Sequence, residues 1–204
     1  DLAAASERGV PVCNVPTYGT MAVAQFATAL LLELCHQAGK HSVDARSGAW
    51  TKRADFCYWL NPLVELDGKT LGIIGFGRIG QAFARIAQAL GMSVLACANH
   101  PDPRLESASL RYATLAEVYA QADVISLHCP LFDSSRGMID AAAIAQMKPG
   151  VLLINTARGQ LVVEQDLADA LNSGRVGGAA LDVLSTEPPL AGSPFPLRMC
   201  SSDA

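Results

Sequence analysis

The chain has 204 residues, of which 50% are apolar and only 17% charged, so a well-filled core is expected and disorder is not. Its net charge is −4, from 15 basic and 19 acidic residues, and no basic stripe is visible, so nucleic acid is not an expected partner. The length suits one domain with additional pieces, or two small domains.

Membrane insertion and secretion are not expected either. The most apolar stretch, Met21–Cys35, is too short for a span and is interrupted by polar residues, and the first residues mix charges with alanine, unlike a signal peptide. The six cysteines form no CxxC pair, and several fall in apolar runs. This pattern indicates buried free thiols in a cytoplasmic protein, with no metal site.

The first predicted element is a helix over Met21–Ala38, with Thr20 as its expected N-cap. Apolar residues lie nearly all round this helix, which predicts burial on both sides. Residues 39–66 form a long polar and aromatic stretch that includes Trp50 and Trp59. A loop of this length inside a compact domain is often a contact surface for another subunit.

From residue 70 onward, predicted strands and helices alternate with short links. The predicted strands are Thr70–Gly75, Ser93–Cys97, Asp123–Cys129, Val151–Asn155 and Gly177–Val183. The predicted helices are Arg78–Leu90, Thr114–Gln121, Asp140–Met147 and Glu164–Asn172. Two of these helices carry start signals, a capping box at Thr114 and an N-cap at Asp140. The alternation predicts an α/β fold, a doubly wound parallel (Rossmann) sheet covered on both faces.

A glycine fingerprint, Gly75-x-Gly77-x-x-Gly80, lies between the first of these strands and its helix. Gly75 permits a tight turn, Gly77 lets the backbone approach a pyrophosphate, and Gly80 lets the helix pack close to the strand. The helix N-terminus at Arg78 and Ile79 offers partial positive charge to phosphates. An ordinary glycine turn is the alternative, but the βαβ context favours dinucleotide binding.

The next strand ends at residues 97–100, where an acid that reads the ribose is expected. The nearest acid is Asp102, which lies between two prolines several residues further on. We therefore expect NAD or NADP, with NADP slightly favoured, and Asn99, His100 and Arg104 as groups able to hold a 2′-phosphate. Alternatively, Asn99 or Asp102 contacts a plain ribose and NAD binds.

Two further strand ends carry candidate residues. His128-Cys129-Pro130 ends a strand at the edge where ligands of doubly wound folds collect. His128 is a possible general base, although a core histidine is the more common case. Thr156-Ala157-Arg158-Gly159 follows a buried strand, and the Arg158 guanidinium can hold a carboxylate and polarise a carbonyl beside it. A structural salt bridge is the alternative for Arg158.

These motifs, with Asp182-Val183-Leu184-Ser185-Thr186-Glu187-Pro188, resemble the NAD(P)-dependent D-2-hydroxyacid dehydrogenases, the family of glyoxylate/hydroxypyruvate reductases and phosphoglycerate dehydrogenase. The resemblance implies that Arg158 holds the substrate and that Glu187 pairs with a catalytic histidine. It places Ser135 and Asp182 beside the cofactor, and Ala98 where NAD-specific members carry Asp. Without the other motifs, Glu187 would belong to a solvated turn.

The implied function is hydride transfer between a nicotinamide cofactor and a 2-hydroxy or 2-oxo acid. A non-catalytic dinucleotide-binding sensor or scaffold module is the alternative. The resemblance also implies a homodimer through residues 21–60, because family members pair there as two-fold dimers. No histidine follows Glu187, so this chain is expected to be inactive alone.

The same resemblance divides the chain into three parts. Residues 1–19 are expected to be a remnant of a substrate domain, with Val10–Asn14 as its last strand. Residues 20–190 are expected to form the dinucleotide-binding domain, and residues 191–204 a divergent or truncated tail.

Overall fold

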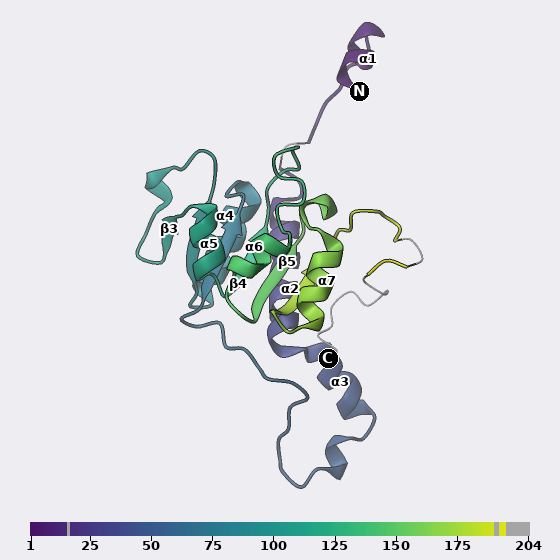
Figure 1. Ribbon diagram of the computed structural model, residues 1–204, viewed down its shortest axis with the longest axis vertical. Coiled ribbons are helices and arrows are strands. Elements are labelled where there is room, and N and C mark those ends of the chain that lie inside the picture. The colour runs from purple at the N-terminus through teal and green to yellow at the C-terminus, as the bar shows by residue number, and fades with distance from the viewer. Residues whose placement is uncertain (16, 190–191, 195–204) are drawn as a thin grey trace.

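The computed structural model describes residues 1–15, 17–189 and 192–194, and its centre is a six-stranded sheet (Figure 1). The strands are β1 (Thr70–Ile74), β2 (Ser93–Cys97), β3 (Leu110–Tyr112), β4 (Val124–Leu127), β5 (Val151–Asn155) and β6 (Val176–Leu181). Every pairing is parallel, in the order β3-β2-β1-β4-β5-β6. This confirms the predicted doubly wound sheet, whose strand order reverses between β1 and β4. Ligands of such folds bind at the carboxyl edge beside that reversal.

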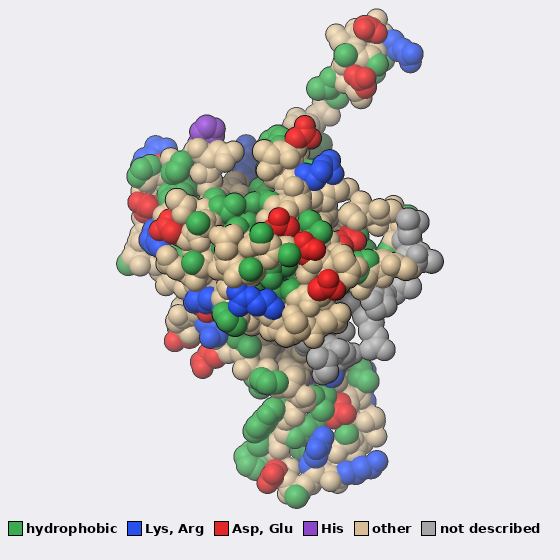
Figure 2. Space-filling view, in the orientation of Figure 1, with side chains coloured by type: hydrophobic (Ala, Val, Ile, Leu, Met, Phe, Trp, Pro, Cys, Tyr) green, Lys and Arg blue, Asp and Glu red, His purple; other side chains and the backbone are tan. Residues whose placement is uncertain are grey.

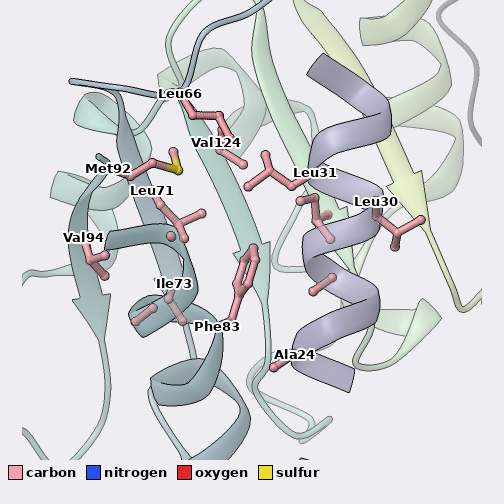
Figure 3. Close-up of a cluster of buried hydrophobic side chains, with 14 of the residues drawn as sticks. Ala24, Leu30, Leu31, Leu66, Leu71, Ile73, Phe83, Met92, Val94 and Val124 are labelled. Atoms are coloured by element: carbon pink, nitrogen blue, oxygen red, sulfur yellow. The ribbon is translucent and has the colours of Figure 1, made fainter. Parts of the chain in front are cut away.

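Helices cover both faces of the sheet, and each face has its own apolar core. The helices are α1 (Leu2–Glu7), α2 (Thr20–His36), α3 (Ala38–Arg46), α4 (Arg78–Ala89), α5 (Leu115–Gln121), α6 (Ala141–Gln146) and α7 (Glu164–Asn172). Helices α2 and α4 pack together on one face, and α5, α6 and α7 lie on the other. Figure 3 shows the first core, in which Phe83 of α4 lies between α2 and β1. The predicted coverage of both faces is confirmed.

Two predicted helix starts are confirmed by their hydrogen bonds. Thr114 Oγ1 accepts the Glu117 N–H at 3.2 Å, and Glu117 Oε2 accepts the Thr114 N–H at 2.8 Å. Asp140 Oδ1 accepts the Ala143 N–H at 2.8 Å. These side chains satisfy N–H groups that have no partner within the helix.

The amino edge of the sheet is held by charged side chains. Asp123 Oδ2 accepts the Thr70 N–H at 2.8 Å, and Asp123 Oδ1 accepts the Lys148 ammonium at 2.9 Å. Arg175, just before β6, donates to the Ala145 carbonyl in α6 at 2.9 Å. Together these contacts tie the starts of β1, β4, β5 and β6 to one another and to α6.

Helix α2 differs from the prediction in its start and in its surroundings. Gly19 occupies the N-cap position, so Thr20 is already helical and does not cap. One face packs on the sheet, whereas Met21, Phe26 and Leu32 on the other are 59%, 41% and 38% exposed. The predicted burial on both sides is therefore wrong for the single chain, because the sheet covers only one side of the helix.

Residues 39–66 contain more helix than predicted. Helix α3 covers Ala38–Arg46, and a 3-10 turn, η1, covers Trp50–Lys52. The polar composition of α3 gave no apolar period, so the sequence indicated a loop. Figure 1 shows that this segment, which we name the arm (residues 38–63), projects from the sheet.

The first residues and two cysteines also differ from expectation. Residues 10–14 are not a strand, since no neighbouring strand pairs with them in the part of the chain that the structure describes. Cys13 and Cys57 are exposed rather than buried, whereas Cys35 is buried as expected. The expected tail lies outside the described residues except for 192–194. No described helix combines the length and apolarity that a membrane span requires.

Candidate functional site

The glycine turn between β1 and α4 lies at the carboxyl edge of the sheet. The Gly75 N–H donates to the Cys97 carbonyl at 2.9 Å, so the turn contacts the end of β2. Gly75 has a φ of +98°, and a Cβ there would lie 2.4 Å from the Cys129 backbone nitrogen. A Cβ on Gly80 would lie 2.6 Å from the Gly75 carbonyl oxygen. Both glycines are therefore required by close packing of the turn against β4 and α4.

Gly77 has no such packing reason. A Cβ at this position would meet no heavy atom of the described chain within 4 Å, and its φ is −80°. Gly77 is the N-cap residue of α4, which begins at Arg78 and Ile79. The open space beside Gly77 therefore lies at the positive end of a helix dipole, which favours an anionic group.

The connection after β2 contains an ion pair that the sequence did not reveal. Ala98 packs against the core, while Asn99 and His100 are exposed. Arg104 Nε donates to Asp102 Oδ1 at 2.9 Å, and Arg104 Nη2 donates to Asp102 Oδ2 at 2.8 Å. Side-chain and backbone hydrogen bonds from Arg104 lower the pKa of Asp102. The nearest acid and the nearest guanidinium after β2 thus bind each other.

The His128 side chain is half-buried and packs against core residues. Its Nε2 is 2.9 Å from the hydroxyl of buried Ser126, and its ring meets Phe83 of α4 at a centroid distance of 5.6 Å. Burial lowers the pKa of His128 to about 4, so the imidazole is neutral near pH 7. This position favours the interpretation as a core histidine over that as a general base.

The loop after β4 is shaped by Ser135. Its Oγ accepts the Phe132 N–H at 2.8 Å and donates to the Pro130 carbonyl at 3.2 Å. The Cys129 thiol lies 3.9 Å from the Met138 sulfur, and burial raises the pKa of that thiol. The Ser135 hydroxyl therefore stabilises the loop that follows Cys129 by hydrogen bonds within that loop.

The arginine turn after β5 is built by a buried amide. Asn155 Nδ2 donates to the Arg158 carbonyl at 2.9 Å, and Asn155 Oδ1 accepts the Ala157 N–H at 3.0 Å. The Arg158 side chain is exposed. Thr156 Oγ1 is buried and has no hydrogen-bond partner among the described residues. A buried hydroxyl without a partner is uncommon and indicates room for a polar group from outside the chain.

A close crossing joins the arginine turn to the loop after β6. A Cβ on Gly159 would lie 1.9 Å from the Leu184 carbonyl carbon, so the two backbones touch there. Gln160 Nε2 donates to the Ser185 carbonyl at 3.0 Å, and Glu164 Oε1 accepts the Ser185 N–H at 2.6 Å. The sequence did not predict this crossing, since it joins residues distant in the chain.

The loop after β6 presents two exposed carboxylates at the same edge. The Asp182 N–H donates to the Asn155 carbonyl at 2.9 Å, which continues the pairing of β5 and β6. Glu187 Oε1 accepts the Leu184 N–H at 2.7 Å, so this side chain braces its own loop. Both side chains are exposed, and the crossing at Gly159 holds their loop beside Arg158.

Comparison with known proteins gives a consistent family. Residues 28–201 match the NAD binding domain of the D-isomer specific 2-hydroxyacid dehydrogenases. A hydroxypyruvate reductase of Blautia hydrogenotrophica is 56% identical over 92% of this chain and 58% of that protein. A glycerate dehydrogenase of Methylorubrum extorquens is 39% identical over 100% of this chain and 61% of that protein.

Solved structures agree with the sequence comparison. The TT0316 protein of Thermus thermophilus superposes with a TM-score of 0.84 at 40% identity, over 95% of this chain and 60% of that one. A glyoxylate reductase described as from Paecilomyes thermophila gives 0.80 at 36% identity, over 95% and 57%. The chain therefore spans less than two thirds of the length of each of these relatives.

Proposed function

Since the chain belongs to the D-isomer specific 2-hydroxyacid dehydrogenase family, we propose that residues 20–190 bind a nicotinamide dinucleotide in an oxidoreductase of 2-hydroxy and 2-oxo acids. The observation that carries this proposal is the open space at Gly77, at the start of α4. A pyrophosphate placed there meets the helix N-terminus without a side chain in its way.

The residues around that space fit such a cofactor. The buried Thr156 hydroxyl, which has no partner among the described residues, lies on the arginine turn at the same edge. The proposed lining residues are Gly75, Gly77, Arg78, Ile79, Gly80, Asn99, His128, Cys129, Pro130, Ser135, Thr156, Ala157, Arg158 and Asp182. The bound nicotinamide supplies or accepts the hydride, and the chain binds and orients it.

Arg158 and Glu187 are the proposed catalytic residues. The exposed guanidinium of Arg158 holds the carboxylate of a 2-oxo acid and polarises its carbonyl. In the proposed mechanism Glu187 hydrogen-bonds the imidazole of the histidine that the family resemblance implies, raises its pKa by opposite charge and so supports proton transfer to the substrate oxygen. No histidine follows Glu187 among the 204 residues, so no described residue is assigned that role. The contact of Gly159 with Leu184 keeps the two loops in fixed relation.

Cofactor binding is tested by titration calorimetry with NADH and NADPH. We expect Gly77→Val to abolish binding, because the branched side chain fills the space for the pyrophosphate. Gly19→Val is the matched control, since a Cβ at Gly19 also meets nothing within 4 Å and Gly19 lies outside the glycine turn. Equal binding by both variants, with unchanged melting temperatures, would sink the assignment.

The preference between NAD and NADP is proposed to lie slightly toward NADP. The support is Ala98, which packs against the core at the end of β2 and offers no carboxylate to repel a 2′-phosphate. Asn99 and His100 follow it with exposed side chains. NADP is therefore expected to bind at least as well as NAD.

The exposed apolar side of α2 and the arm are proposed to bind a second copy of the chain. Large apolar side chains remain exposed on both elements: Met21, Phe26 and Leu32 on α2, and Val43, Trp50, Phe56 and Trp59 on the arm. Figure 2 shows hydrophobic side chains gathered on the part of the chain that projects below the sheet. The arm is braced internally, because the His41 ring accepts the Leu60 N–H at 3.1 Å. A preformed apolar surface of this kind favours pairing with an identical one.

A further inference from the structure

The connection between β2 and β3, residues 98–109, begins beside the glycine turn. At its start, the Cys97 carbonyl accepts the Gly75 N–H at 2.9 Å. Further along, Glu106 Oε1 accepts the N–H of Tyr112, the last residue of β3, at 2.9 Å, and the Tyr112 ring meets the Phe76 ring of the glycine turn edge-on at a centroid distance of 5.7 Å. The residues between these anchors therefore project from the edge of the sheet at which the cofactor is proposed to bind.

Within this connection, Asp102 is held rigidly. Pro101 and Pro103 flank it, and each ring fixes its own φ. The Asp102 carboxylate also accepts the Arg104 N–H at 3.1 Å, as the N-cap of a 3-10 turn over Pro103–Leu105. The carboxylate is thus fixed by the backbone, independently of the Arg104 side chain.

The Arg104 side chain is held only from one side. Its guanidinium makes two hydrogen bonds to Asp102, yet the side chain is 89% exposed. Exposed ion pairs are weak, so a group of higher negative charge can displace the carboxylate. A 2′-phosphate carries up to two negative charges and accepts a guanidinium fork as well as a carboxylate does.

We propose that Asp102 determines cofactor choice by competing with the 2′-phosphate of NADP for the Arg104 guanidinium. This rests on the proposed binding of a nicotinamide dinucleotide at the glycine turn. With Asp102 in place, NADP gains Arg104 only by breaking the ion pair, and NAD binds without disturbing it. Asp102 is therefore a specificity-determining residue that acts through Arg104.

The other carboxylate in this connection provides a matched control. Glu106 Oε1 accepts the Tyr112 N–H at 2.9 Å, and in the described part of the chain no hydrogen bond or ion pair joins the Glu106 carboxylate to Arg104. Glu106→Gln removes the same charge from the same connection and keeps an oxygen for Tyr112. If removal of one negative charge is enough to raise NADPH affinity, both Asp102→Asn and Glu106→Gln show the rise. If the rise requires that the Arg104 guanidinium loses its carboxylate partner, only Asp102→Asn shows it.

The experiment measures NADPH and NADH affinities by titration calorimetry at low salt. The proteins are the parent chain, Asp102→Asn, Arg104→Ala, the double variant and Glu106→Gln. We expect Asp102→Asn to raise the NADPH-to-NADH affinity ratio up to about fivefold, the strength of an exposed ion pair. Arg104→Ala should lower the ratio about tenfold, the loss of one charged hydrogen bond.

The double variant decides whether Asp102 acts through Arg104. We expect it to match Arg104→Ala, since Asp102 has nothing to withhold once the guanidinium is gone. The proposal would be overturned if Asp102→Asn raised the NADPH-to-NADH affinity ratio as much in the Arg104→Ala background as in the parent chain. An equal rise of that ratio in Glu106→Gln would also overturn it. So would an unchanged ratio in both single variants while both cofactors bind. If the parent chain binds neither cofactor, the proposed function itself fails, and this inference fails with it.

Discussion

The half-buried His128 predicts a specific loss of stability in mild acid. Its pKa is lowered to about 4 in the folded chain, against 6.5 for an unperturbed histidine. The unfolded chain therefore binds a proton below about pH 6.5 that the folded chain does not bind until about pH 4. Stability from the neutral imidazole is complete above pH 6.5 and declines as the pH falls toward 4.

The size of this effect follows from the two pKa values. The full difference corresponds to about 3 kcal/mol, and about 2 kcal/mol of it is lost by pH 5.

Asp123 affects stability in a different pH range. Burial opposes ionisation of its carboxyl, but the Thr70 N–H and Lys148 outweigh it and lower the pKa. Its stabilising effect is therefore lost only below about pH 4, its ordinary range.

Urea denaturation of the parent chain and of His128→Gln between pH 8 and pH 5 measures the effect. The variant loses ring contacts with Phe83 at every pH, so its stability is lower by a constant amount. The parent should lose about 2 kcal/mol more than the variant over this range. Parallel pH profiles of the two chains, or an imidazole pKa above 6 from NMR titration, would refute a neutral His128 in the folded chain.

Four further outcomes are expected. Ala98→Asp should shift preference toward NAD, and a parent chain that prefers NAD tenfold, about 1.4 kcal/mol, would contradict the proposed NADP preference. Gly159→Ala should destabilise by about 1–3 kcal/mol in urea, because its Cβ would overlap the Leu184 carbonyl. Asp140→Ala should cost about 1 kcal/mol, and Asp140→Asn should retain most of the cap. Light scattering should show a dimer that Phe26→Glu dissociates, and a monomeric parent chain would argue against the apolar interface.

Sequence patterns predicted the elements whose causes are local. Thr114 and Asp140 cap helices through contacts with residues only three positions away, so spacing alone identifies them. Short apolar runs that alternate with segments of helical periodicity correctly predicted the positions of five of the six strands. The missed strand, Leu110–Tyr112, has only three residues, too few for a period to be visible.

Elements that depend on distant partners were predicted less well. Val10–Asn14 has the composition of a strand, but a strand also needs a neighbour to pair with. Helix α3 is polar, and the sequence gave no apolar face from which to infer it. Helix α2 has apolar residues all round, yet only the sheet side is buried in one chain.

The same distinction applies to the candidate site. The sequence placed the glycine turn and the arginine turn at the carboxyl edge, because strand order and motif spacing determine those positions. It did not predict that Asp102 pairs with Arg104 or that Gly159 touches Leu184. It left His128 open between core and catalysis, and the contacts with Ser126 and Phe83 favour the core. Such pairings depend on side-chain conformation and long-range packing, which no local pattern encodes.

The charged contacts at the amino edge have a consequence for how such a chain can change. Asp123, Lys148 and Arg175 fasten the sheet at one end of its strands, and the candidate site occupies the opposite end. A substitution that alters the ligand at the carboxyl edge leaves this fastening untouched. Substitutions that change ligand specificity and substitutions that change thermal stability can therefore accumulate at separate residues of one sheet. Their effects are expected to add, so that neither kind requires a compensating change of the other kind.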